Sequence, residues 1–181
     1  MNPSLSQKII TANIELHQKE AQYYDLIHRE IFNSGEQKLI SDVLAKALSL
    51  ISKNQISTLD IGAGTGNITL KLLDNKNIRS IVAVDLSKEM LGELKNKLGG
   101  EARVKLVNED IDSFLDIQTQ GFDLITISSV LHHLPDYFAT TERIIHKLNP
   151  GGVLLILLFA VRAKFLFWHC CTLLKVTASL G

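Results

Sequence analysis

The stretch that decides the fold runs from Thr58 to Asn67 and reads Thr-Leu-Asp-Ile-Gly-Ala-Gly-Thr-Gly-Asn. A short apolar strand leads here into a turn with three glycines in five positions, and an apolar helical pattern from Ile68 to Leu73 follows directly. Glycines let the backbone turn tightly and come close to a ligand. Ligands of doubly wound α/β sheets bind outside the carboxyl ends of the strands, where strand, turn and helix meet in this way. The stretch therefore predicts the ligand-binding corner of such a sheet.

The spacing of the glycines indicates which nucleotide to expect. The dinucleotide pattern G-x-G-x-x-G needs a third glycine at Asn67, whereas this chain has it one residue earlier, at Gly66. A nicotinamide-dependent dehydrogenase is therefore disfavoured. Residues 60–66 instead resemble motif I of the class I S-adenosylmethionine-dependent methyltransferases, an acid and an apolar residue followed by G-x-G-x-G. The resemblance implies S-adenosyl-L-methionine as cofactor and assigns four residues to its binding: Asp60, Gly62, Ala63 and Gly64. The alternative is a turn that only joins strand to helix.

The composition limits the chain to one domain and excludes some partners. With 181 residues, of which 46% are hydrophobic, it is long enough for one sizeable core. The 19 basic residues balance the 19 acidic ones, so we expect no nucleic-acid partner. Residues 1–8 lack the pattern of a signal peptide, and the two cysteines, Cys170 and Cys171, are adjacent and cannot form a disulfide framework. A cytoplasmic location is expected.

We divide the domain into an N-terminal helical cap (1–54), a cofactor-binding core (55–159) and an apolar-basic tail (160–181). Residues 6–28 are mostly good helix formers without Gly or Pro, and a second apolar helical stripe follows residues 33–35. The sequence Tyr23-Tyr24-Asp25 resembles an aromatic motif that many small-molecule methyltransferases carry before their first strand. The resemblance implies that Tyr24 covers the cofactor. Aromatic packing between two helices is the alternative.

Further strands follow the glycine turn, each with candidate site residues at its end. Residues 80–85 form an apolar strand that ends on Asp85, 23 residues beyond Gly62, where a carboxylate can accept hydrogen bonds from both ribose hydroxyls. Leu86 is expected beside it at the cofactor. Ser87 should cap the next helix, which Gly99 and Gly100 end.

The third strand, residues 104–108, leads into Glu109-Asp110-Ile111. The resemblance implies that Asp110 and Ile111 hold the adenine, and a plain acidic turn is the alternative. A fourth strand covers residues 121–129, and Ser128 near its end is expected at the cofactor. A helix should run from Asp136 to about Leu148.

A turn at residues 149–152 then leads to a fifth strand. Alternating strands and helices predict a parallel sheet built by right-handed crossovers. The resemblance covers roughly residues 55–157 and implies a Rossmann-like fold with strand order 3-2-1-4-5.

The two histidines after the fourth strand, His132 and His133, are the catalytic candidates. Methyl transfer mainly needs donor and acceptor held in line, but an oxygen or thiol acceptor must also lose a proton, for which imidazole is well suited. The alternative is that one of them braces the loop. No Cys or His cluster has metal-ligand spacing, so we expect no metal. The chain lacks the Asn/Asp-Pro-Pro-Tyr string typical of methyltransferases that act on planar amino groups, which favours a small-molecule acceptor methylated at oxygen or carbon.

The tail departs from the family pattern. The family usually continues with a helix and an antiparallel hairpin of strands six and seven, but only 24 residues follow Leu157. We therefore expect a C-terminally truncated or frame-altered methyltransferase without strands six and seven, whose bare fifth strand predicts self-association. One alternative is that residues 160–176 form a basic-apolar helix on a membrane surface or protein partner. Another is that the chain is a non-catalytic adenosyl-binding module or partner subunit.

Overall fold

The structure is a computed structural model that describes residues 11, 15, 18–134, 136–160 and 168–175. The predictions for most of residues 1–17, and for residues 161–167 and 176–181 of the tail, lie outside the described residues. None of the described helices is both long enough and apolar enough to cross a membrane.

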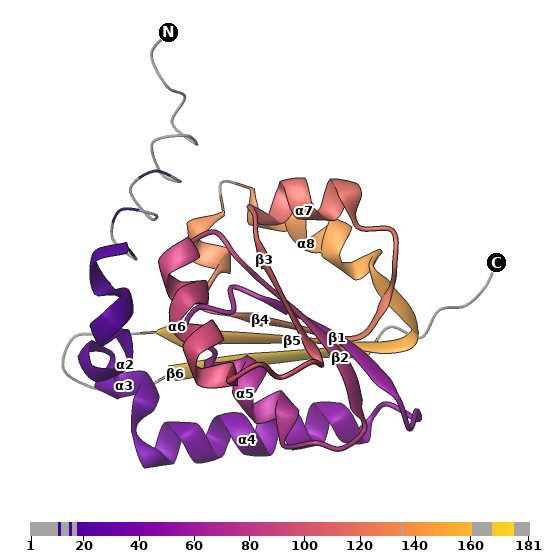
Figure 1. The fold of residues 1–181 in the computed structure, drawn as a ribbon. Helices are drawn as coiled ribbons and strands as arrows, with labels where there is room; N and C mark the ends of the chain where they lie inside the picture. The colour runs from indigo at the N-terminus through magenta and orange to yellow at the C-terminus, as the bar shows by residue number, and fades with distance from the viewer. Residues whose placement is uncertain (1–10, 12–14, 16–17, 135, 161–167, 176–181) are drawn as a thin grey trace, which may run out of the picture.

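A twisted sheet forms the centre of the molecule, with the strand order β3-β2-β1-β4-β5-β6 (Figure 1). Its strands are β1 (Ile56–Ile61), β2 (Ile78–Asp85), β3 (Val104–Asn108), β4 (Phe122–Ser128), β5 (Leu148–Ala160) and β6 (Trp168–Lys175). The first five are parallel to one another. The predicted doubly wound α/β sheet with the order 3-2-1-4-5 is therefore confirmed.

The sixth strand corrects the expectation that the sheet ends at the fifth. β6 runs antiparallel to β5 over eight residue pairs, from Val153 opposite Lys175 to Ala160 opposite Trp168. An antiparallel neighbour needs only a short connection, whereas a parallel one needs a crossover of a dozen or more residues. The seven residues between β5 and β6 are enough for this connection. β5 is therefore paired on both sides, and the premise of a bare fifth strand was wrong.

Helices cover both faces of the sheet, and Figure 1 shows α4 and α5 below it and α7 and α8 above it. α4 (Ser34–Ser49), α5 (Asn67–Leu73) and α6 (Lys88–Leu98) bury their apolar stripes against one face. α7 (Ile111–Ile117) and α8 (Tyr137–Ile145) pack on the other. Because both faces are buried, the strands are apolar along most of their length, as parallel strands usually are.

Short helical segments precede α4 where the sequence predicted one or two longer helices. They are η1 (Ala21–Tyr23), α2 (Tyr24–Ile27) and α3 (Arg29–Phe32). The ring of Tyr24 packs on His28 with centroids 4.3 Å apart, and it meets Phe32 edge-on at 6.3 Å. Aromatic packing, which was the alternative for Tyr24, is thus present, and η1 lies against α6.

Helix ends mostly follow the predicted caps. The Ser87 hydroxyl accepts from the amide of Met90 at 3.3 Å, and Gly99 ends α6 in the left-handed conformation, with φ +57°. α8 ends at Ile145 and not near Leu148, because Leu148 already pairs with Phe122 as the first residue of β5. The predicted turn at residues 149–152 appears as a register shift within β5.

Candidate functional site

The glycine turn is bound to the end of the neighbouring strand β2. The carbonyl of Val84 accepts from the amides of Gly62 at 2.9 Å and Ala63 at 3.1 Å. The amide of the following residue, Gly64, donates to Oδ2 of Asp85 at 2.8 Å. The turn between β1 and α5, residues 62–66, is called the glycine loop below. Hydrogen bonds to β2 therefore hold the backbone of this loop without any contribution from a ligand.

The three glycines of this loop have different surroundings. A Cβ atom on Gly62 would lie 2.0 Å from Cγ2 of Val130, and one on Gly66 would lie 2.4 Å from Cδ1 of Leu94. A side chain at Gly62 or Gly66 would therefore displace a neighbouring side chain of the protein itself, and both glycines have a positive φ, +71° and +100°, that other residues rarely adopt. A Cβ atom on Gly64 would meet nothing nearer than a backbone oxygen at 4.0 Å, although the φ of +52° is itself unfavourable for other residues. Gly64 alone of the three faces open space, as a backbone that receives a ligand would.

Asp85 lies at the carboxyl end of β2 with its carboxylate held at both oxygens. Oδ2 accepts from Gly64 and Oδ1 from the amide of Ser87, each at 2.8 Å. A carboxylate offers about four lone-pair positions, and two of them receive these amides. The neighbouring Leu86 is half-buried, and its carbonyl accepts from the side chain of Asn108 at 2.9 Å. The predicted pair Asp85 and Leu86 thus lies next to the glycine loop.

Asp60 lies beneath the loop and has no exposed surface. Its carboxylate accepts from the hydroxyls of Thr69 at 2.6 Å and Thr126 at 2.8 Å. Burial raises the pKa of Asp60 to about 6, against the two hydrogen bonds, which lower it. The sequence placed Asp60 at the cofactor. In the structure its carboxylate links β1 to the start of α5 and to β4, and its contact with the cofactor stays a prediction.

Asp110 and Ile111 begin α7, a helix that the sequence reading did not predict. The Asp110 side chain accepts from the amide of Ser113 at 3.0 Å, which caps the helix. Burial acts to raise the pKa of Asp110, but the bonds from Ser113 outweigh it and the pKa is lowered. Ile111 is buried in the core between the sheet and the helices α7 and α8. The Asp110 carboxylate is therefore ionised and stands at the edge of the sheet where β3 ends.

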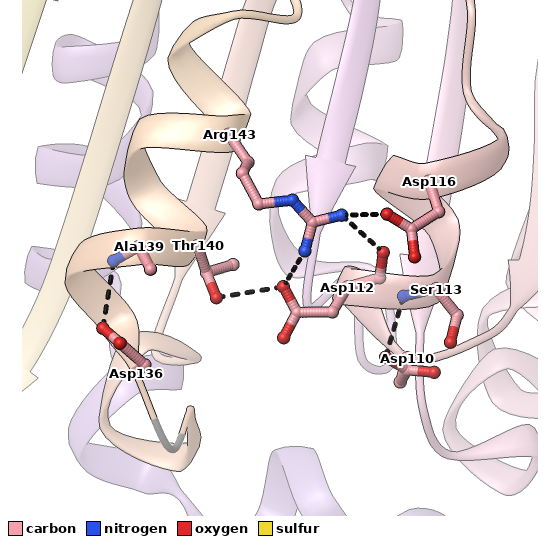
Figure 2. A network of polar contacts seen from close by, with 8 residues as sticks. All are labelled: Asp110, Asp112, Ser113, Asp116, Asp136, Ala139, Thr140 and Arg143. Atoms are coloured by element: carbon pink, nitrogen blue, oxygen red, sulfur yellow. Dashed lines mark hydrogen bonds and ion pairs between the residues drawn. The ribbon is translucent and has the colours of Figure 1, made fainter.

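Arg143 joins α7 to α8, and Figure 2 shows its guanidinium reaching from α8 to the acids of α7. Its nitrogens donate to the carboxylates of Asp112 and Asp116, both at 2.6 Å, and to the carbonyl of Asp112 at 2.9 Å. Thr140 adds a bond to Asp112 at 3.1 Å. At the near ends of these helices, Asp110 caps α7 and Asp136 caps α8 (Figure 2). The bonds from Arg143 to Asp112 and Asp116 are called the Arg143 clamp below. They fix the two caps relative to each other.

The loop after β4 carries the candidate histidines and contacts the glycine loop through Val130. Ser128 is half-buried at the end of β4. Ser129 has a φ of +55°, the one positive value of a non-glycine residue among those described, and its amide donates to Leu157 at 3.0 Å. Unfavourable backbone of this kind often marks functional sites. His132 and His133 belong to a single turn, η2 (Leu131–His133), and the amide of His133 donates to Val130 at 2.8 Å.

Tyr24 approaches the site from the N-terminal segments. Burial, followed by the negative charge of Asp85, raises the pKa of the Tyr24 phenol to about 12. The sequence predicted this residue over the cofactor, and that role stays a prediction.

Three further residues at the glycine loop were not found from the sequence. The hydroxyl of Thr65 and the ammonium of Lys97 each donate to the carboxylate of Asp25 at 2.6 Å. The pairs are 40 and 72 residues apart in the chain, so no local pattern reveals them. The single hint was the position of Asp25 next to Tyr24. Among the described residues no group of three His, Cys, Asp or Glu side chains is arranged to hold a metal ion, and the absence of a metal stays a prediction.

Comparison with known proteins identifies the family. The sequence profile described as a methyltransferase domain matches residues 59–154, just over half of the chain. The chain is 35% identical over 136 residues to a malonyl-(acyl-carrier protein) O-methyltransferase from Priestia megaterium (strain DSM 319 / IMG 1521). This alignment covers 75% of the chain and 48% of the relative. It is 32% identical over 105 residues to a demethylmenaquinone methyltransferase from Staphylococcus aureus (strain MRSA252), covering 56% and 42%.

The chain spans about half the length of the curated relatives it matches. Among solved structures, the N-methyltransferase NodS from Bradyrhizobium japonicum WM9, in complex with S-adenosyl-l-homocysteine, superposes with a TM-score of 0.66. The match covers 80% of this chain and 71% of that chain at 24% identity, and it shows that the two proteins share a fold. The glycine loop, β2 and β4 all fall within the matched residues 59–154, and the chain belongs to the methyltransferase-domain family.

Proposed function

We propose that the chain binds S-adenosyl-L-methionine at the carboxyl ends of β1 and β2 and transfers its methyl group to a small-molecule acceptor, at oxygen or carbon. The observation that carries this proposal is the open space over Gly64, directly beside the carboxylate of Asp85. Both residues lie in the part of the chain that matches the family profile. A strand end with a free backbone surface and an oriented acid suits an adenosyl ligand.

The proposed cofactor site is built from the ends of four strands. S-adenosyl-L-methionine supplies a methyl group already activated by the positive charge on its sulfur. Asp85 accepts the ribose hydroxyls, and the loop backbone at Gly62, Ala63 and Gly64 lies along the methionine part. The remaining predicted contacts are Leu86, Asp110, Ile111 and Ser128 from the core and Tyr24 from the N-terminal cap. In this proposal the core (55–159) binds, the cap (1–54) covers, and the tail (160–181) contributes β6.

Asp110 and Asp85 have distinct tasks in this arrangement. Asp110 keeps a low pKa and can accept a hydrogen bond from an exocyclic amine such as that of adenine. Ile111 begins the helix behind it and provides apolar surface. The Arg143 clamp holds α7, and with it Asp110, at a fixed distance from the loop that carries the histidines.

The acceptor side is assigned to the turn after β4. Holding donor and acceptor in line supplies much of the catalysis, roughly 7–11 kcal/mol for well-oriented reactants. His132 or His133 acts as general base when the acceptor is a hydroxyl or an acidic carbon. The names of the relatives indicate both O-methylation and C-methylation. An ionised carboxylate acceptor would need no base, so the role of the histidines depends on the acceptor.

Two measurements test this proposal. Calorimetry should show binding of S-adenosylmethionine and S-adenosylhomocysteine but not of NAD, and NAD binding alone would overturn it. Transfer of a radiolabelled methyl group should then be assayed with two acceptor classes, acyl thioesters bearing a free carboxylate and quinols. Binding without transfer to either class would favour the non-catalytic adenosyl-binding module.

The histidines are tested in the same assay once an acceptor is found. With a hydroxyl acceptor, turnover should rise with pH as the base loses its proton, and this rise should disappear when the base is replaced. Replacement of the base by Ala should lower turnover and leave cofactor affinity intact. Full turnover in both His132→Ala and His133→Ala would remove them from the reaction.

A further inference from the structure

Three polar side chains from separate parts of the chain meet at the glycine loop. Asp25 comes from α2, Thr65 from the loop itself and Lys97 from the last turn of α6. The Asp25 carboxylate accepts from the Thr65 hydroxyl at one oxygen and from the Lys97 ammonium at the other, both at 2.6 Å. Lys97 also donates to the Thr65 carbonyl at 3.0 Å. The three residues therefore form a closed ring of hydrogen bonds.

The surroundings of this ring combine shelter with access to solvent. Thr65 is 3% exposed, whereas the side chains of Asp25 and Lys97 are 38% and 33% exposed. The hydroxyl contact is thus protected by the packing of the loop, and the ion pair stays within reach of solvent ions. Such a connection is strong enough to hold a segment in place and weak enough to open.

The position of the ring links two proposed cofactor contacts. Thr65 stands between Gly64, which faces open space, and Gly66, which packs on α6. Asp25 directly follows Tyr24, and the negative charge of Asp85 is one cause, after burial, of the raised pKa of the Tyr24 phenol. The same ring therefore fixes the glycine loop from one side and the segment that bears Tyr24 from the other.

We propose that Asp25, Thr65 and Lys97 form a latch that holds the N-terminal helices, and with them Tyr24, against the glycine loop, and so controls how fast the adenosyl ligand leaves. This inference rests on the proposed function, because the ligand is the one proposed there. The three are positioning residues, since they act on the ligand through Tyr24 and the loop backbone. A brace that only adds stability would change unfolding and leave ligand release unaltered.

The test compares release of S-adenosylhomocysteine, followed by stopped-flow fluorescence, in the full chain and its variants. Asp25→Asn removes the charge, and Thr65→Val removes the hydroxyl with little change of shape. Both should raise the dissociation rate constant about three- to tenfold, the range expected for loss of one partly exposed hydrogen bond or ion pair. Thr65→Ser keeps the hydroxyl and should restore slow release. Lys38→Met removes the exposed Lys38–Asp42 ion pair on α4 and should change nothing.

The dependence of the release rate on ionic strength is a second measurement, and a purely structural role of the three residues would not alter it. Raising the ionic strength about tenfold screens the exposed Asp25–Lys97 pair, so it should speed release from the wild-type chain but not from Asp25→Asn. Equal salt dependence in the two proteins would overturn the latch. So would wild-type release rates in both Asp25→Asn and Thr65→Val.

Amide hydrogen exchange of residues 21–32 without ligand tests the latch independently of the proposed function. Exchange there should be faster in Asp25→Asn and Thr65→Val than in Lys38→Met, because the segment opens more often. Unchanged exchange would contradict the latch. If the wild-type chain fails to bind S-adenosylhomocysteine at all, the proposed function falls and the role in release falls with it.

Discussion

The carboxylate of Asp85 accepts a hydrogen bond from the amide of Gly64 at 2.8 Å, so the end of β2 and the glycine loop are joined through one residue of each. The residue proposed to bind the ribose is thus also the residue that shapes the loop for the methionine part. A substitution of Asp85 will therefore alter both ribose binding and the shape of the loop, and ligand affinity and stability have to be measured separately.

Asp85→Ala is expected to weaken S-adenosylhomocysteine binding at least about tenfold, because charged hydrogen bonds of roughly 1.5–3 kcal/mol each are lost. It should also lower the free energy of unfolding by roughly 1–3 kcal/mol, since the amides of Gly64 and Ser87 lose their acceptor. Calorimetry and urea unfolding measure the two effects. Asp74→Ala, at an exposed acid that ends α5, is the control and should alter neither. Unchanged affinity in a folded Asp85→Ala protein would remove this residue from the site.

Gly64→Ala and Gly62→Ala should fail in opposite ways. Gly64→Ala should lower the free energy of unfolding by only about 1–2 kcal/mol, the strain of a left-handed alanine, yet it loses cofactor affinity because the methyl group enters the ligand's space. Gly62→Ala has the same strain and also drives its Cβ atom into Val130, which should cost roughly 1–3 kcal/mol more. Adding Val130→Ala should recover part of that loss. Near-normal affinity in Gly64→Ala would show that the loop does not cradle the ligand.

The buried Asp60 makes the stability depend on pH in a direction opposite to that of most acids. Its pKa is raised to about 6 in the folded protein from an ordinary value of 3.8, so between these pH values the folded state holds a proton that the unfolded chain releases. Its contribution is therefore greatest below pH 3.8 and declines as the pH rises to about 6, by roughly 2–3 kcal/mol.

Asp60→Asn removes this titration and isolates it from the other acids. The free energy of unfolding of the variant minus that of the wild type should rise by roughly 2–3 kcal/mol between pH 4 and pH 7. Urea unfolding at four or five pH values measures this difference. A difference that stays constant with pH would mean that Asp60 titrates at its ordinary value.

The Arg143 clamp should depend on the fork of the guanidinium and not only on its charge. Arg143→Lys keeps one cation but cannot reach Asp112 and Asp116 together, so a loss of about 1 kcal/mol of stability is expected, limited by solvent exposure. Asp116→Asn, which removes the more exposed partner, should cost less than about 0.5 kcal/mol. Thermal unfolding compares them. Equal midpoints for Arg143→Lys and wild type would show that the clamp adds nothing measurable.

The pairing of β6 with β5 can be tested by two neighbouring proline substitutions. Thr172 lies opposite Ile156 and Cys171 opposite Leu157, and along an edge strand the amides of adjacent residues point alternately to the partner and away from it. One of Thr172→Pro and Cys171→Pro should therefore break the ladder and cause self-association in light scattering, while the other is tolerated. Identical behaviour of the two variants would contradict the observed register.

The strands of the core were predictable because their sequences leave little choice. β2 is apolar over most of its length and ends on Asp85, and β1 runs into three closely spaced glycines, so periodicity and turn chemistry agree. The position of Asp85 next to the glycine loop follows from these two elements alone. Roles in ligand binding stay predictions.

Elements held by distant contacts escaped prediction. α7 has two turns and begins within residues 109–111, which were interpreted as a turn, and it is held by Arg143 more than 25 residues away. Asp25 gave no sign of its partners for the same reason. β6 was missed because the residues after β5 were counted against three family elements, although one antiparallel strand needs few of them.

The order of β5 and β6 along the chain has a consequence for folding. β5 ends at Ala160 and β6 follows it from Trp168 to Lys175, so the outer edge of β5 is covered by a strand that comes later in the chain. Until β6 pairs, the apolar edge of the folding sheet is open to any other unpaired strand. The delay between the docking of β5 and that of β6 therefore sets how long each folding chain is exposed to aggregation.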